Sequence, residues 1–586
     1  MTTDRGMNVA NSVECGPRDG ICLYFEGEAI SYATVAETAA RLRRLLADAG
    51  VARGDHVALA MSNSPAFVVA YLAILGLGCV AVCISPALAA DEIDFILDDS
   101  GCKAAFADAN LDERFARRGI RRLEVDAPVA GHPPLPTVGV GPDHPAVIVY
   151  SSGTTGRPKG VVLSHGNVDF TARSKVRYMG VRPDDRLLLF LPLHHCFGQN
   201  AIMNAAFCAG ASVVLQRRFD REAVIGSLRA DGVTMVFGVP TTFLSLEEHL
   251  TDLDIAGVRY WFSAAAPLPL EVEQRWAKRM GRPIYQGYGQ TECSPFATYN
   301  HLIAIREGCV GTPIEQVELR VVDPQDDRDV APGEAGEILL RGPNVMSGYW
   351  NRAEETARAL RGGWLHTGDI GRLDADGYLS IEDRLTDLII VGGRNVYPAE
   401  VENVLYGHPG VAEAAVFGVP DPFLGEEVWA TVVLHPSHPQ APEELEALCR
   451  ASIAAYKVPS VIAFADRLPR NPTGKILKRE LRAAAHRPVA RPVTTAPTAA
   501  ETQAWVARWL ERRLNLGAGT VEGGRSFAEY GLDSILGVAL ARELGDHLRC
   551  GLEPTLVWET ATLAALVQHL TAIGAVERDR ATPVAA

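Results

Sequence analysis

The chain has 586 residues, of which 47% are hydrophobic and 22% are charged, a composition typical of a soluble protein with three or four domains. Its formal net charge of -15 argues against a nucleic-acid-binding surface, which needs a clustered basic face. The eleven cysteines contain no C-x-x-C pair, so neither a zinc site nor a disulfide framework is indicated, and a reduced cytoplasmic setting is expected.

Helical stretches alternate with short apolar strands from residue 20 to about 380, which predicts an α/β fold. Residues 30–50 predict a helix that Ser31 caps and Gly50 ends. Between Glu337 and Arg384, alternating apolar residues and abundant glycine predict β-rich structure. Strands are expected at residues 57–60, 80–84, 146–150, 186–190 and 212–215.

Residues 66–84 form an uncharged apolar segment that is long enough to span a membrane. Gly76 and Gly78 interrupt it, and β-branched residues gather only after them. A spanning helix has to be continuous, so a buried helix, a glycine turn and a buried strand are favoured over a membrane span.

The sequence that follows the strand at 146–150 is suited to binding nucleotide phosphates. Two glycines let backbone N–H groups approach an anion, hydroxyl groups donate to phosphate oxygens, and Lys159 adds positive charge. The string lacks the G-x-x-x-x-G-K-[ST] pattern, so a P-loop NTPase is not indicated. The phosphate-binding residues are predicted to be Ser151, Ser152, Gly153, Thr154, Thr155, Gly156 and Lys159.

This string, Tyr150 to Gly160, resembles the signature of the acyl-adenylate-forming superfamily, which includes acyl-CoA synthetases, aryl-CoA ligases and adenylation domains. Further motifs follow in the order of that family over residues 20–485. They are Gly287-Tyr288-Gly289-Gln290-Thr291-Glu292, Trp364-Leu365-His366-Thr367-Gly368-Asp369 and Asn471-Pro472-Thr473-Gly474-Lys475. Any one of these residues alone would more often be a cap or a surface charge, whereas four motifs in order favour the enzyme.

The resemblance implies a role for each motif residue that binds ATP or the metal. Tyr288 would stack on the adenine, Thr291 would contact the α-phosphate, and Glu292 would hold Mg²⁺. Asp369 would accept hydrogen bonds from the ribose hydroxyls, and Arg384 would support the same sugar. Gly287 would also line the ATP site.

The resemblance also implies which residues carry the catalysis. Lys475, on a small mobile domain, would orient the carboxylate and stabilise the α-phosphate. Thr154, Glu292 and His195 complete the predicted catalytic group. The hinge of the small domain would be Thr386, where relatives usually have Asp or Lys.

Near the end of the chain, Gly531-Leu532-Asp533-Ser534 precedes an apolar helix. Asp-Ser before a helix is in its simplest interpretation an N-cap pair. The whole terminal segment resembles acyl or peptidyl carrier domains, which implies that Ser534 carries a covalent 4′-phosphopantetheine. Leu532 and Asp533 are then expected to form the approach surface for a phosphopantetheinyl transferase.

These resemblances define the predicted fold class and domain boundaries. A large N-terminal α/β adenylation subdomain is expected at residues 1–383, and a small α+β C-terminal subdomain at 384–485. A Pro/Ala/Thr-rich linker at 486–500 leads to an all-α helical-bundle carrier domain at 501–575 and a disordered tail at 576–586.

The predicted acyl pocket indicates the class of acid. Residues 191–198 contain none of the acidic residues with which amino-acid-activating relatives hold an ammonium group, so an α-amino acid is disfavoured. Small apolar walls suit an alkyl chain and also admit an aryl ring. The predicted lining residues are His195, Val239, Ala264, Ala265, Gly287 and Gly311.

The sequence therefore predicts a ligase that uses ATP and Mg²⁺ to convert a carboxylic acid, expected to be a fatty acid, to an acyl-adenylate. The acyl group would then pass to the phosphopantetheine thiol of its own carrier domain and serve as a starter unit for a downstream polyketide or nonribosomal peptide synthase. The alternatives are an acyl-CoA or aryl-CoA synthetase that uses free CoA, and a carrier protein whose large domain has lost ATP chemistry.

Overall fold

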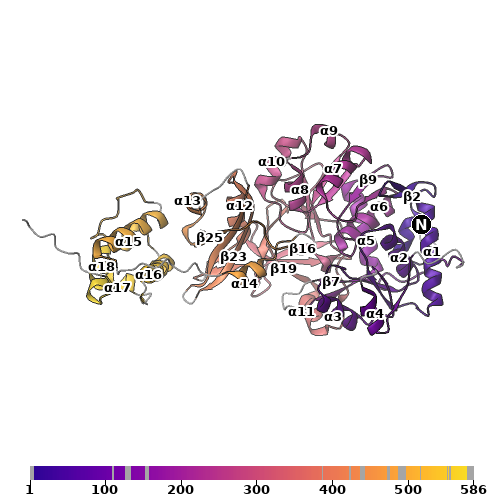
Figure 1. The fold of residues 1–586 in the computed structure, drawn as a ribbon, viewed down its shortest axis with the longest axis horizontal. Helices are drawn as coiled ribbons and strands as arrows, with labels where there is room; N and C mark the ends of the chain where they lie inside the picture. The colour runs from indigo at the N-terminus through magenta and orange to yellow at the C-terminus, as the bar shows by residue number, and fades with distance from the viewer. Residues whose placement is uncertain are drawn as a thin grey trace, which may run out of the picture. The chain divides into compact units, whose positions relative to one another are not determined.

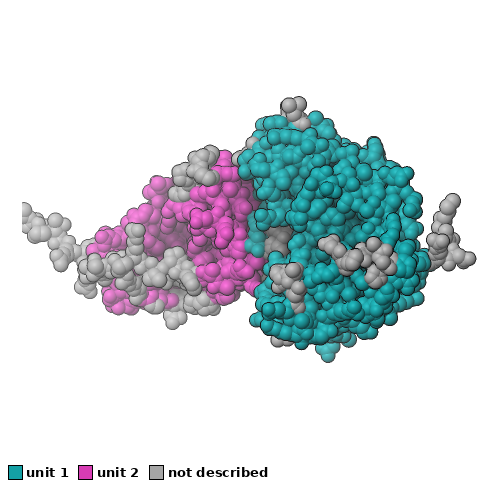
Figure 2. Space-filling model, turned by 45° about the vertical axis from the view of Figure 1, so that its right-hand side comes forward, with its two compact units in different colours: residues 1–386, 470–475 teal, residues 387–469, 476–586 magenta. Residues whose placement is uncertain are grey.

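A computed structural model gives the structure of the chain. It describes residues 6–108, 111–125, 133–151, 158–247, 249–385, 387–392, 394–421, 424–435, 442–470, 475–485, 497–514, 516–532, 534–548, 550, 552 and 556–576. The chain divides into two compact units, which Figure 2 colours separately. Unit 1 contains residues 1–386 and 470–475, and unit 2 contains residues 387–469 and 476–586.

Unit 1, which contains the strand labelled β7 in Figure 1, has a sheet whose central strands are apolar and parallel. Its described strands, in sheet order, are β18 (Gly348–Tyr349), β8 (Lys159–Ser164), β7 (Pro145–Ser151), β4 (Val80–Cys83), β3 (His56–Ala60), β5 (Ala104–Ala107) and β6 (Arg121–Arg122). The helices of this part are α1 (Tyr32–Asp48), α2 (Pro65–Gly76), α3 (Ala90–Ser100), α4 (Asp112–Arg117) and α5 (His165–Met179). Parallel strands are covered on both faces, which is why β4 consists of four buried residues.

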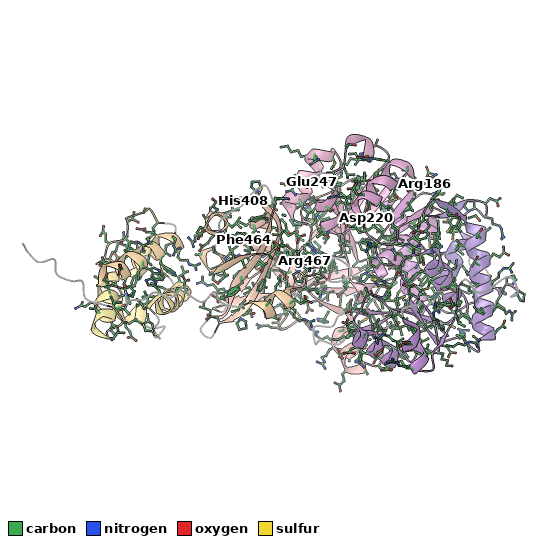
Figure 3. The ribbon with its side chains drawn as sticks, viewed as in Figure 1. Arg186, Asp220, Glu247, His408, Phe464 and Arg467 are labelled. Carbon is green, nitrogen blue, oxygen red and sulfur yellow. The ribbon has the colours of Figure 1, made fainter. Side chains whose placement is uncertain are left out.

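A second sheet of unit 1 has the described strand order β15 (Thr312–Pro313), β14 (Thr298–Tyr299), β13 (Tyr285–Tyr288), β12 (Tyr260–Ser263), β11 (Met235–Gly238), β9 (Arg186–Leu189), β10 (Ser212–Leu215), β1 (Ile21–Phe25) and β2 (Glu28–Ser31). Its helices are α6 (Asn204–Ala209), α7 (Arg221–Ala230), α8 (Pro240–Glu247), α9 (Asp252–Ile255) and α10 (Leu270–Met280). Asp220, labelled in Figure 3, starts α7 because its carboxylate accepts from the N–H of Ala223 at 2.9 Å.

A third sheet of unit 1 is antiparallel in the described part of the chain. It has the order β16 (Glu318–Val322), β17 (Ala335–Arg341), β19 (Leu365–Leu373) and β20 (Leu379–Arg384), and α11 (Ala353–Ala359) precedes β19. Short 3₁₀ turns lie at Val9–Glu14 (η1), Thr291–Cys293 (η5) and Arg361–Gly363 (η6), and Phe197–Met203 (η4) is a π-helix. The β-rich structure predicted between Glu337 and Arg384 is thereby confirmed.

Unit 2 begins with a sheet of β22 (Arg394–Val396), β21 (Ile389–Val391), β24 (Gly425–Leu434) and β23 (Val411–Asp421), and β25 (Val461–Phe464) also pairs with β24. Its helices are α12 (Pro398–Tyr406), α13 (Pro442–Ser452) and α14 (Lys478–Ala484), with the 3₁₀ turn η7 at Ala455–Lys457.

The carrier segment of unit 2 is helical throughout its described elements. These are α15 (Ala499–Arg513), the 3₁₀ turn η8 (Phe527–Tyr530), α16 (Ser534–Leu548), α17 (Leu556–Thr560) and α18 (Leu563–Ala572). Thr498 caps α15, so the helix begins two residues before the predicted carrier boundary at 501. Trp509, Leu540 and Leu566 are fully buried in its core, and the indole N–H of Trp509 donates to Glu543 at 2.8 Å.

The structure confirms several local predictions. Ser31 caps α1, because its hydroxyl accepts from the N–H of Thr34 at 3.1 Å, although the helix ends at Asp48 and residues 28–31 form a strand. The apolar segment 66–84 is a buried helix, a turn at Gly78 with φ +74° and a buried strand. In the described part of the chain, helices long and apolar enough to cross a membrane are absent.

Candidate active site and carrier attachment site

The predicted phosphate loop connects two antiparallel strands. Ser151 ends β7 and lies opposite Lys159, which begins β8. Ser152, Gly153, Thr154, Thr155 and Gly156 lie outside the described residues. The two ends of the loop are thus fixed by the hairpin, and Lys159 stands at its base.

Lys159 is surrounded by groups that link it to Glu292. It forms an ion pair with Glu355 of α11, and its ammonium lies 5.3 Å from the centroid of the Tyr349 ring. The hydroxyl of Tyr349 donates to Oε1 of Glu292 at 3.1 Å. Because β18, which carries Tyr349, pairs with β8, the hydrogen bond of Tyr349 joins the predicted metal ligand to the strand pair that carries Lys159. Tyr349 and Glu355 were not predicted from the sequence.

The environment of Glu292 suits a divalent cation. Burial raises the pKa of its carboxyl, and the hydrogen bond from Tyr349 and the charge of Arg384 act in the opposite direction. A bound cation would favour the ionised form, and Mg²⁺ typically binds one or two carboxylates together with substrate phosphates. The residues present therefore fit Mg²⁺, with Glu292 as the protein ligand.

The predicted adenine and ribose residues are in direct contact. The hydroxyl of Tyr288 donates to Oδ2 of Asp369 at 2.7 Å, and Nε of Arg384 lies 3.2 Å from Oδ1 of the same carboxylate. Asp369 and Arg384 are opposite one another on β19 and β20. Burial, followed by the charge of Asp369, raises the pKa of Tyr288 well above its usual value, so its hydroxyl keeps its proton.

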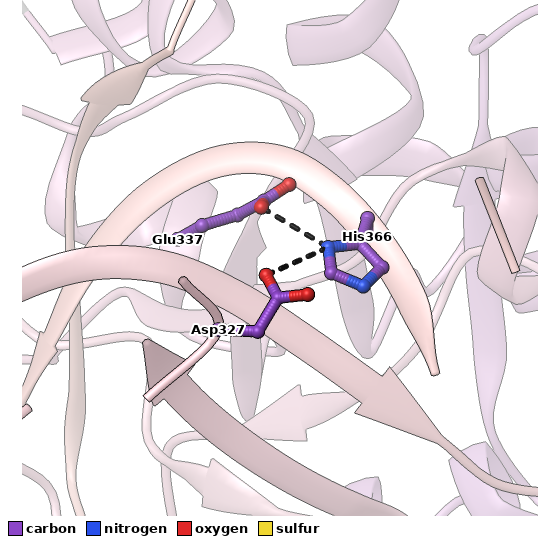
Figure 4. A group of neighbouring side chains, drawn as sticks. All are labelled: Asp327, Glu337 and His366. Atoms are coloured by element: carbon purple, nitrogen blue, oxygen red, sulfur yellow. Dashed lines mark hydrogen bonds and ion pairs between the residues drawn. The ribbon is translucent and has the colours of Figure 1, made fainter. Parts of the chain in front are cut away.

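A buried carboxylate that the sequence analysis missed supports the predicted ribose motif at the start of β19. Glu337 Oε1 accepts from the N–H of Gly368 at 3.1 Å, and Oε2 lies 3.1 Å from Nδ1 of His366 (Figure 4). Asp327 lies 4.0 Å from the same nitrogen. Arg361 already supplies a positive charge, 3.3 Å from Asp327 and 3.7 Å from Glu337, so the group is suited to positioning the start of β19 rather than to binding a metal. Its signal in the sequence is a carboxylate in an otherwise apolar strand.

His195 is held as a neutral side chain. Burial lowers its pKa to about 4, and its Nδ1 accepts from the N–H of Phe197 at 3.3 Å, which leaves the proton on Nε2. Asn63, also missed by the sequence analysis, fixes the strand end before it. Its side chain donates to the carbonyl of Leu191 at 3.0 Å and accepts from the N–H of Leu193 at 2.8 Å.

The predicted acyl-pocket residues differ in how deeply they are buried and in how much free space surrounds them. A Cβ at Gly287 would lie 2.8 Å from the ring of Phe262, and one at Gly311 would lie 1.9 Å from the carbonyl oxygen of Tyr299. Val239 is buried, Ala264 is partly buried, and Ala265 is exposed with φ +71°. The two glycines therefore allow close approach of a ring at Gly287 and of backbone at Gly311.

The remaining predicted residues lie near the division between the two units or in the carrier segment of unit 2. Thr386 is outside the described residues, at the division between the two units. Lys475 is partly buried and belongs to the 470–475 segment of unit 1. Ser534 is the first residue of α16, and Asp533 is outside the described residues. The prediction that Leu532 forms part of an approach surface is wrong, because Leu532 is buried in the apolar core of the carrier segment.

Comparison with known proteins identifies the family. Residues 9–350 match the AMP-binding enzyme family, and residues 400–475 match the AMP-binding enzyme C-terminal domain. The chain belongs to the AMP-binding enzymes. In this AMP-binding enzyme, residues 504–570 also match the phosphopantetheine attachment site family. The predicted combination of an acyl-adenylate-forming enzyme with a carrier domain is thus confirmed.

Individual relatives of this AMP-binding enzyme are CoA ligases. It is 39% identical over 466 residues to a feruloyl-CoA synthase of Amycolatopsis sp, covering 78% of this chain and 94% of that protein. It is 32% identical over 514 residues to a long-chain-fatty-acid–CoA ligase of Bacillus subtilis (strain 168), covering 79% and 91%. The enzyme is therefore an ATP-using ligase of the acyl- or aryl-CoA ligase type.

The fold agrees with a solved relative. The crystal structure of ATP-bound MatB from Rhodopseudomonas palustris matches with a TM-score of 0.78 and 32% identity, covering 82% of this chain and 99% of that chain. The predicted fold class, a large α/β adenylation domain followed by a small subdomain and a helical carrier domain, is confirmed.

Proposed function

We propose that this enzyme activates a carboxylic acid as its acyl-adenylate and transfers the acyl group to a thiol carried by its own Ser534. The observation that supports this most directly is the presence of an AMP-binding enzyme and a phosphopantetheine attachment domain in one chain. In the first half-reaction a carboxylate oxygen attacks the α-phosphorus of ATP and pyrophosphate leaves. In the second, the thiol sulfur attacks the acyl carbon, AMP leaves, and the thiol proton passes to solvent.

The charges of the site are suited to the first half-reaction. A carboxylate and ATP repel one another, and negative charge develops as pyrophosphate leaves, so catalysis depends on positioning and neutralisation. Lys475 would orient the carboxylate and stabilise the α-phosphate, while Lys159 would serve the outer phosphates after its ion pair with Glu355 opens. Glu292 would hold Mg²⁺, which supplies electrostatic stabilisation of the leaving group. Tyr288 and Arg384 keep Asp369 in place for the ribose.

The carrier end provides a site for the second half-reaction. Ser534 would bear the phosphopantetheine arm, which supplies a flexible thiol when it is attached. The helix N-terminus at Ser534 is a favourable position for the phosphate of the arm. A short linker raises the effective concentration of a tethered group to the order of mM, which favours the carrier of the same chain over one in solution.

The acid that we propose is a fatty acid, since the segment around neutral His195 has no acidic residue with which to hold an α-ammonium group. An aryl acid is the second candidate, because the feruloyl-CoA synthase relative has the higher identity. The loaded carrier would supply a starter unit to a polyketide or nonribosomal peptide synthase, after attachment of the arm by a phosphopantetheinyl transferase.

The main alternative is transfer to free CoA, which is supported by the names of the relatives. A Ser534→Ala protein separates the two acceptors. With ATP, Mg²⁺, acid and CoA, this variant is expected to release pyrophosphate but to form acyl-CoA far more slowly than the wild type loads its own carrier. Acyl-CoA formation by the variant at the wild-type loading rate would show that CoA is the acceptor.

A further inference from the structure

Lys175 is a buried lysine that has no charged partner among the described residues. It lies on α5 and is only 2% exposed. Its ammonium lies 3.5 Å from the centroid of the Phe296 ring and 4.4 Å from that of Phe262. Among the residues that the structure describes, none forms a hydrogen bond or an ion pair with it.

Packing alone does not account for a lysine at this position. Burial of an amine without a hydrogen-bond acceptor is unfavourable, and more so if the amine is charged. Cation–π attraction to the two ring faces offsets only part of this cost. Burial lowers the pKa of Lys175 well below its usual value, and Cys293 acts in the opposite direction. Leucine or methionine would fill the same space without this cost.

The rings that contact Lys175 belong to the region of the predicted acyl pocket. The ring of Phe262 lies next to Gly287, where an added Cβ would be only 2.8 Å from it. Phe197 packs edge-on against Phe262 with ring centroids 6.2 Å apart, and its N–H holds the imidazole of His195. Lys175 therefore shares an aromatic wall with two of the residues expected to contact the acid.

We propose that Lys175 binds a second carboxylate on the substrate, so that the acid activated by this enzyme is a dicarboxylic acid. This inference rests on the proposed function. One carboxylate attacks the α-phosphorus, as in any acid of this class, and the other stays ionised and pairs with the ammonium of Lys175. The aromatic rings exclude water around the pair, which strengthens the attraction between the two charges. A neutral chain end would leave the buried amine unpaired, and this is a source of strong discrimination.

The test compares acids that differ only at the distal end. The probes are the α,ω-dicarboxylic acids of four to twelve carbons, terephthalic acid, and the monomethyl ester of each. Acid-dependent pyrophosphate release gives kcat/KM for the wild type, Lys175→Met, Lys175→Arg and Lys278→Met. Lys278 lies on α10 and is exposed, so its variant is the matched control.

We expect the wild type and Lys278→Met to favour the best diacid over its monoester by about a hundredfold or more. Lys175→Met should reverse this order, and Lys175→Arg should keep the preference for diacids because it retains the charge. A wild type that prefers monoesters, or a Lys175→Met protein that still prefers diacids, overturns the inference while leaving adenylation intact. Absence of pyrophosphate release with all probes and with monocarboxylic acids would overturn the proposed function and this inference together.

Discussion

Lys475 and Lys478 are three positions apart in the sequence but have different expected roles. Lys478 is the first residue of α14, and its ammonium forms an ion pair with Glu402 at 2.9 Å. Lys475 is assigned to the transition state, where loss of one stabilising group typically lowers the rate by about 10²–10³-fold. Lys475→Ala should reduce acid-dependent pyrophosphate exchange by that factor, whereas Lys478→Ala should stay close to the wild type. Near-wild-type exchange in Lys475→Ala would contradict the assignment.

Three buried histidines lead to a second prediction, which concerns how the stability of the protein depends on pH. Burial lowers the pKa of His165 to about 3, of His194 to about 3 and of His195 to about 4. Below a pH of about 6.5 these three histidines bind protons in the unfolded chain but stay neutral in the native chain. Protonation of the unfolded chain therefore lowers the stability of the native protein as the pH falls from about 6.5 toward 4, and has no effect above that range. Within that pH range, each buried histidine lowers the free energy of unfolding by about 1.4 kcal/mol for each unit by which the pH falls.

Urea unfolding of the full chain, followed by tryptophan fluorescence at pH 5 and pH 6, measures this effect. His165→Gln should reduce the dependence of the unfolding free energy on pH by about 1.4 kcal/mol per unit. His249→Gln is the control, because His249 is exposed and is hydrated in both states. An unchanged dependence in His165→Gln would show that His165 is already protonated in the native protein.

The role of a single residue could be predicted from the sequence where the residue belongs to a motif. It could not be predicted where the residue holds a segment that is distant in the sequence. The pairing of Asp369 with Arg384 brings together two residues that the motifs had both assigned to the ribose. Asn63 and Glu337 were missed, because they hold backbone that lies 128 and 31 residues further along the chain, respectively. Leu532 was placed on a surface although it is buried, since its position in the Gly-Leu-Asp-Ser motif does not reveal which way its side chain points.

At the scale of elements, two glycines with similar backbones have very different surroundings. Gly311 has φ +85° next to β15, and a Cβ there would lie 1.9 Å from the carbonyl oxygen of Tyr299. Gly333 has φ +87° in the turn before β17, and a Cβ would meet nothing within 4 Å. Gly333→Ala should cost about 1–2 kcal/mol of unfolding free energy, the usual cost of a left-handed alanine.

Gly311→Ala should cost about 4 kcal/mol or more, because the backbone of β14 has to move as well. Urea unfolding of both variants measures the difference. Equal losses for the two variants would indicate that the approach of Gly311 to Tyr299 is relaxed easily.

Elements were predictable where burial or capping leaves a local pattern. The helix–turn–strand of residues 66–84 follows from its continuous apolar character and its glycines. The π-helix at Phe197–Met203 and the placement of β9 between β10 and β11 were not predicted. Strand order depends on contacts between distant segments, and a run of apolar residues specifies burial without specifying which strand becomes its neighbour.

At the scale of the whole molecule, the order of domains could be predicted because each carries its own motif. The AMP-binding match covers residues 9–350. The C-terminal domain follows at 400–475 and the phosphopantetheine attachment domain at 504–570. The identity of the acid was harder to predict from the sequence, because small apolar walls fit alkyl and aryl groups equally. The burial of Lys175 against two aromatic rings is visible only in the structure.

Intact-protein mass spectrometry tests self-loading most directly. The phosphopantetheinylated enzyme would be incubated with ATP, Mg²⁺ and a mixture of fatty, aryl, dicarboxylic and amino acids, with Ser534→Ala as the control. We predict one dominant mass increase, equal to an acid minus water, which is absent from the control and identifies the acid in the same spectrum. Pyrophosphate release without any mass increase would contradict transfer to Ser534 and would make CoA or another carrier the acceptor.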